Sequence, residues 1–382
     1  MGHFSDKAIE QNEKKYHSEL DKTICVDCIK DKYLSKLVLE NSISNRCSYC
    51  EKKFKSNKAT TFNFIMDEIY KTIFKYYGDA QDLNLPYENG SWIKDAIPIE
   101  DILFEINPGW CDSFFNNLAE SSDPFLHLIK HSNNDWLEIP EHVALIYSWD
   151  SFKDQILYKT RYLFLNDTID EFEDRQIIPA SLMLNALADL CKEFKLIKKI
   201  KKNKLFYRVR SHAQDESFFE FNQMGVAPKK IASAGRMNPV GIPYFYIADS
   251  AQTAISEVIK DQNFWSCATF KLNKDIEVID FSKLPEVPSI FDVNNFRNRQ
   301  KLIFLHELVF DMSQPVGPDE KDHIEYIPTQ VVSEYFRYIF KPEVKGIKYK
   351  SVKNQKGLNI AFFESDNEKI KEFFELLSIE RN

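Results

Sequence analysis

Glycine and arginine are both scarce in this chain of 382 residues, since each occurs only ten times. An excess of positive charge is also lacking, because 58 Asp and Glu against 50 Lys and Arg give a net charge of −8. That balance argues against general affinity for nucleic acid or for an anionic membrane surface. No apolar run approaches the roughly 20 residues of a membrane helix, and the polar N-terminus lacks the apolar core of a secretion signal. We therefore expect a cytoplasmic protein whose seven cysteines are reduced thiols or metal ligands.

Three regions follow one another along the chain. Residues 1–58 are polar and contain four of the cysteines, whereas 59–200 show the three- and four-residue apolar spacing of helices. Short alternating segments, typical of strands, begin after about residue 200. We therefore predict an α+β protein with domains at 1–58, 59–200 and 201–382. Helices are expected at 64–77, 141–164, 179–200, 251–260 and 328–340, and strands at 205–211, 243–248, 268–273, 276–281, 346–351 and 359–364.

A run of lysines lies at the second boundary. Such a run is typical either of a nucleic-acid-binding patch or of a solvated helix end, where cations complement the helix dipole. The acidic character of the whole chain favours the helix end. The run comprises Lys198, Lys199, Lys201, Lys202 and Lys204.

Four cysteines have the spacing of a metal site. Cys25 and Cys28 form one CxxC pair, Cys47 and Cys50 form another, and eighteen residues separate the two pairs. Two such pairs close together provide the four thiolates of a tetrahedral zinc site. Because four thiolates leave no open coordination position, we expect Zn²⁺ to be structural and to stabilise a segment with little apolar core.

Three of the ten arginines fall within 29 residues of one another. Arg208 and Arg210 alternate with apolar residues in one predicted strand, so both guanidinium groups share a face. Arg236 follows between Gly235 and Gly241, where glycine permits tight turns and close approach of the backbone to a ligand. Arginine is well suited to bidentate recognition of phosphate, so this segment predicts an anion site.

Aromatic and acidic residues follow the third arginine. Tyr244 and Tyr246 alternate in a predicted strand, and aromatic rings beside a phosphate-binding arginine suit a nucleotide with a flat base. Glu257 lies on the flank of the next predicted helix, where its carboxylate can face a cleft. Each feature alone is more typical of a surface arginine, a core tyrosine or a solvated glutamate, so the functional interpretation depends on the order of the features taken together.

The order of these blocks resembles the RES domain family, which is named for its arginine, glutamate and serine. The resemblance extends from about residue 205 to 364 and rests on several separated segments. They are YRVRS (207–211), AGRMNPVGIPYFYIADSAQTAISEV (234–258), YIPTQVVSEYFR (326–337), GIKYKS (346–351) and NIAFF (359–363).

The resemblance implies a fold similar to that of ADP-ribosyltransferases, a mixed α/β domain around split sheets, with NAD⁺ as the substrate. It implies that Arg236, helped by Arg208, binds the NAD⁺ pyrophosphate, and that Tyr246 stacks on the nicotinamide or its ribose. Glu257 and Ser351 match the glutamate and the serine of the family. The other residues expected to contact the substrate are Tyr244, Gln330 and Asn359.

Known members of the family are toxins that destroy NAD⁺ by hydrolysis or phosphorolysis, and some transfer ADP-ribose to a protein. Cleaving the nicotinamide–ribose bond develops positive charge on the ribose, which a carboxylate such as Glu257 can stabilise. An NAD⁺-degrading enzyme is therefore the favoured hypothesis, and a protein ADP-ribosyltransferase is the first alternative. A zinc-dependent module that binds nucleic acid or a partner without catalysis is the second, although the matching Arg, Tyr, Glu and Ser positions argue against it.

The first two hundred residues resemble the N-terminal region that accompanies some RES domains and is grouped with HEPN helical domains. HEPN ribonucleases use an arginine followed four to six residues later by a histidine, and 60–200 contain no such pair. Arg299 and His306 have a similar spacing, but the apolar pattern around them already explains a helix. We therefore expect the helical region to sense, dock or oligomerise. Because loss of NAD⁺ harms the producing cell, we also expect restraint by an antitoxin or by the N-terminal region.

Overall fold

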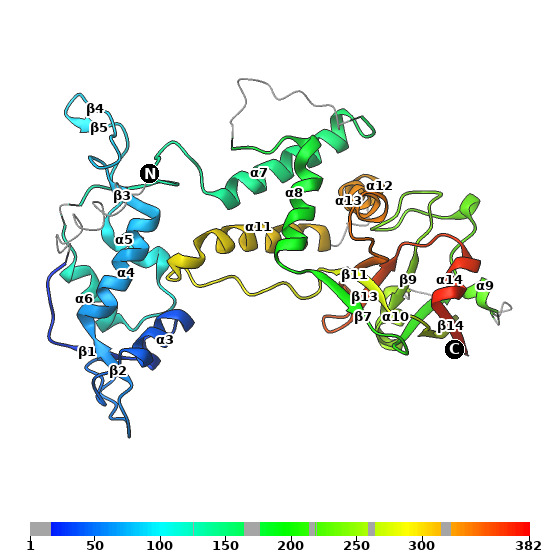
Figure 1. Cartoon of the computed structure of the whole chain (residues 1–382), viewed down its shortest axis with the longest axis horizontal. Coiled ribbons are helices and arrows are strands. Elements are labelled where there is room, and N and C mark those ends of the chain that lie inside the picture. Colours follow the sequence, from blue (N-terminus) through cyan, green and yellow to red (C-terminus); the bar gives the residue numbers. More distant parts are fainter. Residues whose placement is uncertain are drawn as a thin grey trace. The chain divides into compact units, whose positions relative to one another are not determined.

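The computed structural model describes residues 17–124, 126–163, 176–213, 218, 220–258, 264–314 and 322–382, and Figure 1 shows their helices and strands. Contacts within the chain form two compact units. The first comprises Met1–Glu141 with Val287–Lys301, and the second comprises His142–Glu286 with Leu302–Asn382. The mixture of helices and sheets confirms the expected α+β class. None of the helices within these residues is long and apolar enough to cross a lipid bilayer.

The first unit is built around one apolar core, which the cysteine-bearing segment shares with the helices. Helix α4 (Phe62–Tyr76) begins after Thr61, whose side chain accepts a hydrogen bond from the Phe64 amide and caps the helix. Phe62 and Ile65 on its buried face belong to the same cluster as Cys25. The other elements are α2 (Val26–Ile29), α3 (Lys32–Glu40), α5 (Ile99–Ile106), α6 (Asp112–Ser121), η5 (Val293–Asn295) and the strand pairs β1 (Thr23–Cys25) with β2 (Ala59–Thr61), β3 (Tyr77–Asp79) with β6 (Leu128–Lys130), and β4 (Tyr87–Glu88) with β5 (Ser91–Trp92).

An eight-stranded sheet forms the centre of the second unit, in the order β14–β10–β8–β9–β13–β12–β11–β7. Neighbouring strands are antiparallel except for β11 and β12, which run parallel. Six of the eight overlap the predicted strands, whereas β7 and β14 were not predicted. The strands are β7 (Ile197–Ile200), β8 (Leu205–Ser211), β9 (Phe245–Ala248), β10 (Trp265–Leu272), β11 (Ile276–Asp280), β12 (Gly346–Lys350), β13 (Leu358–Phe362) and β14 (Phe374–Arg381).

The sheet is almost divided between β8 and β9. Their register consists of one pair, Tyr207 opposite Ala248, whereas β8 and β10 are paired over seven residues. Beyond that single pair the two strands separate, which leaves room for a site between them. The two halves still belong to a single eight-stranded sheet, so the split sheets that the family resemblance implied stay a prediction.

Among the helices of the second unit, α10, α13 and α14 lie beside the sheet (Figure 1). The helix predicted at 141–164 is α7 followed by a π-helical turn, η2, and residues 164, 259 and 260 of the predicted helices lie outside the described residues. The helical elements are α7 (Glu141–Asp154), η2 (Gln155–Lys159), α8 (Ala180–Glu193), α9 (Phe221–Met224), η4 (Lys229–Ile231), α10 (Ala251–Val258), α11 (Phe296–Ser313, which starts within the first unit), α12 (Asp322–Glu325), α13 (Ile327–Tyr338) and α14 (Asn367–Phe373).

The helix predicted at 179–200 is wrong in its last part. Helix α8 ends at Glu193, and Lys195 follows with a left-handed backbone (φ 53°), which is a common way for a helix to end. The chain then forms β7, which pairs with β11 at the edge of the sheet. Lys198 and Lys199 therefore lie on an edge strand and not at a helix end. Charged side chains at such an edge discourage pairing with other chains.

The compact units do not follow the boundaries predicted at 58 and 200. The cysteine-bearing segment shares its core with α4, and α7 and α8 fall in the same unit as the sheet. A compact unit need not coincide with a domain in the family sense, so the predicted bounds 1–58, 59–200 and 201–382 stay a prediction.

Candidate active site and candidate metal centre

A cavity of about 360 Å³ opens where β8 and β9 separate. Its volume lies within the range of roughly 300–1,000 Å³ that is typical of small-molecule sites. The charged side chains that line it are Arg208, Arg236, Lys353 and Glu257. Three cations against one carboxylate suit a ligand that carries phosphate groups.

Glu257, on α10, is held at this cavity by side chains from β13 and from the end of β12. Ser351 Oγ donates a hydrogen bond to Glu257 Oε1 at 2.6 Å, and Asn359 Nδ2 donates to the same oxygen at 2.6 Å. Within the described residues both donors contact Oε1, which leaves Oε2 to meet a ligand. Three predicted site residues are therefore brought together, one from α10 and two from the β12–β13 hairpin about a hundred residues further along the chain.

The backbone after β12 sets the direction of the hydrogen bond between Ser351 and Glu257. Ser351 Oγ accepts hydrogen bonds from the amides of Lys353 at 3.2 Å and Asn354 at 2.9 Å. With these amides on its lone pairs, the hydroxyl proton points to the carboxylate. Ser351 is buried and is not among the described residues that line the cavity. It therefore supports the Glu257 carboxylate from the protein interior.

Tyr246 lines the cavity with its hydroxyl group fixed. The hydroxyl donates to Asn238 Oδ1 at 2.7 Å and accepts from the Met237 amide at 3.1 Å. Burial, together with the neighbouring Tyr349, raises the pKa of Tyr246 well above its ordinary value, so the ring is neutral. A Cβ atom on Gly235 would lie 2.8 Å from the Tyr246 hydroxyl oxygen, so this close approach requires glycine.

Arg236 lies between the cavity and the C-terminal end of α11. Its Nη1 donates to the carbonyl of Met312 at 2.6 Å and to that of Gln314 at 3.0 Å. Carbonyl groups at a helix C-terminus carry partial negative charge, which holds the guanidinium in place. Both bonds use Nη1, so Nε and Nη2 are the atoms that can meet a phosphate.

Arg208 bridges the two strands that separate at the cavity. From β8 it donates through Nη1 to the Tyr246 carbonyl at 2.7 Å and through Nε to the Met224 carbonyl at 2.9 Å. Burial and the nearby Arg210 lower the pKa of Arg208 to about 9, so it stays a cation at neutral pH. Two of its three nitrogens, Nε and Nη1, donate to backbone carbonyls and stabilise the fold, so Nη2 is the nitrogen that could meet a phosphate.

Two predicted site residues, Tyr244 and Gln330, are not among the described residues that line this cavity. Tyr244 precedes β9, is 2% exposed, and packs against Phe363 and Arg337 in the core. Gln330 is buried on α13, and its Nε2 donates to the Gly235 carbonyl at 2.9 Å. Gln330 therefore supports the turn before Arg236, and the substrate contacts expected of Tyr244 and Gln330 stay a prediction.

Several residues of the site were missed in the sequence, among them Lys353, whose side chain lines the cavity. Tyr349 and Tyr326 line the cavity, Asn238 holds the Tyr246 hydroxyl, and the Asn354 amide orients Ser351. Asn238 falls inside the block around Arg236, and period-two alternation places Tyr349 on the same strand face as Ser351. Asn238 and Tyr349 therefore had a signal in the sequence, whereas the place of Tyr326 depends on contacts between distant segments and the Asn354 amide depends on the turn after β12.

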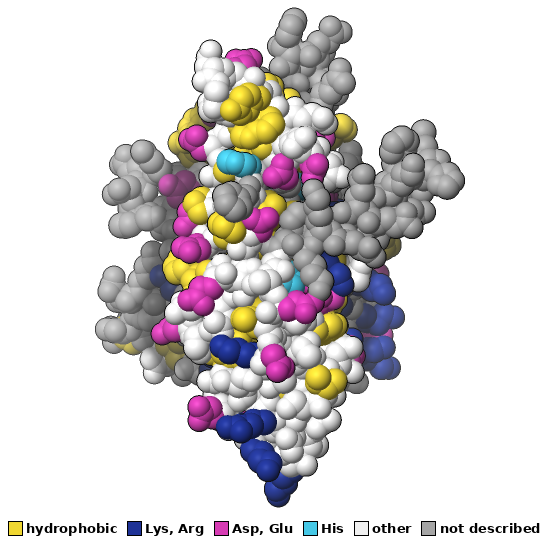
Figure 2. Space-filling view, turned by 90° about the vertical axis from the view of Figure 1, so that its left-hand side faces the viewer, with side chains coloured by type: hydrophobic (Ala, Val, Ile, Leu, Met, Phe, Trp, Pro, Cys, Tyr) yellow, Lys and Arg dark blue, Asp and Glu magenta, His cyan; other side chains and the backbone are white. Residues whose placement is uncertain are grey.

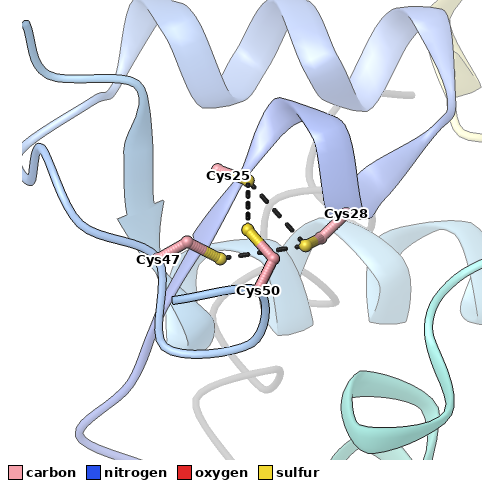
Figure 3. Close-up of side chains that lie close together, drawn as sticks. All are labelled: Cys25, Cys28, Cys47 and Cys50. Carbon is pink, nitrogen blue, oxygen red and sulfur yellow. Dashed lines mark hydrogen bonds between the residues drawn. The ribbon is translucent and has the colours of Figure 1, made fainter. Parts of the chain in front are cut away.

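Figure 3 shows the four cysteines of the first unit gathered in one cluster. Cys25 ends β1, Cys28 lies in α2, and Cys47 and Cys50 lie around the turn that faces them. The Sγ–Sγ distance is 3.6 Å between Cys25 and Cys50, and 3.8 Å both between Cys25 and Cys28 and between Cys28 and Cys47. All four sulfur atoms lie within 4.8 Å of one another.

These distances fit a tetrahedral zinc site. Four sulfur atoms at about 2.3 Å from one Zn²⁺ lie about 3.8 Å from each other. Burial raises the pKa of Cys25 to about 11 and also raises the pKa of Cys28, so a metal ion has to displace protons from these thiols. Cys25, Cys28 and Cys47 are buried and Cys50 is half-buried, which suits a closed, structural metal centre.

Charges of both signs are intermixed on the face shown in Figure 2, with Lys and Arg gathered at its lower tip and lower right edge. In the described residues, Arg299 and His306 each contact a backbone carbonyl, that of Pro288 at 2.6 Å and that of Pro285 at 2.9 Å. These contacts give both residues a packing role.

Two family models match the chain. HEPN/RES N-terminal domain 1 matches residues 40–170, and the RES domain matches residues 205–378. The chain therefore contains a HEPN/RES N-terminal domain at 40–170, followed by a RES domain at 205–378. A RES domain is consistent with NAD-related, toxin-like chemistry. No curated protein and no solved structure matches the chain.

Proposed function

We propose that the chain degrades NAD⁺ by cleaving the bond between nicotinamide and ribose. The observation that carries this proposal is the Glu257 carboxylate, held on one oxygen by Ser351 and Asn359 in a cavity with an excess of positive charge. The cations suit the pyrophosphate of a dinucleotide, and the fixed carboxylate suits the charge that develops on the ribose.

The chemistry needs little acid catalysis, because nicotinamide leaves as a neutral molecule. Its bond to ribose C1′ breaks with the electron pair going to the ring nitrogen, and positive charge develops on the ribose. Glu257 Oε2 stabilises that charge or accepts a hydrogen bond from a ribose hydroxyl. An oxygen of water or phosphate then bonds to C1′ and releases a proton, which gives ADP-ribose or its 1-phosphate.

The other side chains position the substrate in this proposal. Arg236 binds the pyrophosphate through Nε and Nη2, because its Nη1 already donates to the end of α11. The neutral Tyr246 ring packs on the nicotinamide or on its ribose. Arg208 keeps β9 in place through the Tyr246 carbonyl, so it acts mainly on the position of that tyrosine. Positioning of this kind can supply much of the rate acceleration.

A protein ADP-ribosyltransferase is the second candidate. Glu257 is exposed to solvent, so a nucleophilic side chain of another protein has access to the same reacting carbon. The two candidates differ only in the acceptor. Incubation with NAD⁺ labelled in the adenine ring separates them, because degradation leaves the label in small molecules and transfer leaves it on protein. Unchanged NAD⁺ after incubation would count against both.

The biological role that we infer is that of a restrained toxin or antiviral effector, acting on the NAD⁺ of the cytoplasm. The union of a RES domain with a HEPN/RES N-terminal domain supports it, because a toxic activity needs control. An antitoxin, a sensor or activator protein, or self-association of the chain are the forms of control that we propose. The zinc ion has a structural part in the N-terminal region.

A further inference from the structure

A second cavity, of about 200 Å³, shares Arg236 and Tyr326 with the cavity at Glu257. The Arg236 guanidinium lies over the Tyr326 ring, 5.5 Å from its centroid, so these two side chains form the wall between the cavities. A dinucleotide has the same layout. The two phosphates of a dinucleotide lie in its middle, which corresponds to the position of Arg236. One nucleoside extends on either side, which corresponds to the two cavities.

We propose that the second cavity binds the adenosine half of NAD⁺, and that Asp311 and Glu325 recognise its ribose hydroxyls and exclude a 2′-phosphate. This inference rests on the proposed function, which assigns the nicotinamide half to the cavity at Glu257. The two carboxylates provide the recognition, because a carboxylate accepts a hydrogen bond from a ribose hydroxyl, as it does in Rossmann-type NAD sites.

One carboxylate oxygen of Asp311 is hydrogen-bonded within the protein, which fixes the side chain for contact with the ribose. Trp149 Nε1 donates to Asp311 Oδ2 at 2.7 Å, and Lys153 Nζ donates to the same atom at 3.0 Å. The Asp311 side chain remains 41% exposed. Within the described parts of the chain no donor contacts Oδ1, which leaves this oxygen for a ribose hydroxyl.

Two carboxylates, Asp311 and Glu325, and two cations, Lys153 and Arg236, line the second cavity, and in this proposal the pyrophosphate takes up Arg236, so the remaining charges favour NAD⁺ over NADP⁺. Lys153 is an ion-pair partner of both Asp311, at 3.0 Å, and Asp150, at 2.9 Å, so its positive charge is offset. Glu325 is exposed and adds a second carboxylate to the lining. A 2′-phosphate brings a further charge of about −1.5 to −2 against these groups, and the like charges repel.

An apolar wall for the base completes the cavity. Trp149 is 3% exposed and stacks on Phe152 with ring centroids 5.3 Å apart, so its position is fixed. Leu157 and Pro328 line the same space, and a flat base suits such a surface. Trp149 and Leu157 lie in the segment that matches the HEPN/RES N-terminal domain. That domain therefore contributes to the substrate site of the RES domain.

Binding of ADP-ribose and ADP-ribose 2′-phosphate to the full chain tests this subsite. The two ligands differ only in the 2′-phosphate, and neither carries nicotinamide, so no turnover is needed. By calorimetric titration we expect wild-type protein to bind ADP-ribose at least about tenfold more tightly. We expect Glu325→Lys to bring the ratio near one, and Asp311→Asn to shift it in the same direction. Glu307→Lys makes the same charge change at an exposed position of α11 outside the cavity, so it should keep the wild-type ratio.

Equal binding of the two ligands by wild-type protein, no binding of either, or an unchanged ratio in Glu325→Lys would overturn the subsite. Glu325 is exposed, so its substitution should leave the fold intact. The outcome is separate from that of the proposed function. A chain that shows this preference but consumes no NAD⁺ refutes the reaction and keeps the subsite, whereas NAD⁺ consumption without the preference refutes the subsite alone.

Discussion

Ser351 and Glu257, which are 94 residues apart in the sequence, share a hydrogen bond of 2.6 Å. The amides of Lys353 and Asn354 donate hydrogen bonds to the Ser351 hydroxyl oxygen, so the hydroxyl proton points to the carboxylate. Ser351 is therefore a positioning residue, and Glu257 is the group that meets the substrate in the proposed reaction.

Replacing Ser351 by Ala should lower kcat for NAD⁺ by about 10- to 100-fold while KM changes little, because the carboxylate loses one of its two supports. Steady-state kinetics of the variant measures this split. Ser378→Ala, at an exposed position of β14, is the control and should behave as wild type. An increase in KM with kcat unchanged would contradict the positioning role.

Replacing Arg236 by Ala should reduce kcat/KM for NAD⁺ by about 10²-fold or more, because the pyrophosphate loses a bidentate partner. Arg236→Lys keeps the charge without the planar fork, so we expect it to recover only part of the activity. Arg297→Ala, an exposed arginine on α11, is the matched control. Full activity of a folded Arg236→Ala protein would remove this residue from the site.

Replacing Gly235 by Ala should disturb the site although no charge changes. The new methyl group would lie 2.5 Å from Asn238 Oδ1 and 2.8 Å from the Tyr246 hydroxyl, so both side chains have to move. We expect activity to fall by about tenfold or more, since small displacements at a reacting centre have large effects. Activity and thermal unfolding should be measured together. Wild-type kinetics in this variant would show that the position of Tyr246 does not matter.

Removing the metal ligands should destabilise the first unit. Metal analysis should find one Zn²⁺ per chain, and Cys28→Ser should lose it and lower the melting temperature, because the metal contributes folding free energy. Cys111→Ser is the matched control, since Cys111 belongs to the same unit but lies outside the cluster. Retention of one Zn²⁺ per chain by Cys28→Ser would contradict the four-cysteine site.

The sequence predicted those parts of the structure that depend on local pattern. The strand at 205–211 was predicted with its observed bounds, because apolar and charged side chains alternate over Tyr207–Arg210. β7 was missed because its two central residues, Lys198 and Lys199, interrupt the alternation of apolar and polar side chains and extend the helical pattern of α8. β14 was not predicted either.

For the site, family resemblance identified residues that the fold then brings together. Glu257, Ser351 and Asn359 meet as a resemblance of separated blocks implied, although spacing alone could not show it. Tyr246 lines the cavity and Tyr244 does not, because Tyr244 lies before β9 begins and packs into the core. The contact of Arg236 with the end of α11 spans more than seventy residues, and no local pattern announces such a pairing.

The measurement that tests the central claim most directly is the fate of NAD⁺ incubated with the purified full-length protein, with and without phosphate, followed by chromatography. We predict release of nicotinamide together with ADP-ribose or, when phosphate is the acceptor, its 1-phosphate, and we predict that Glu257→Ala abolishes this release while remaining folded. Nicotinamide release at the wild-type rate by folded Glu257→Ala protein would contradict the account.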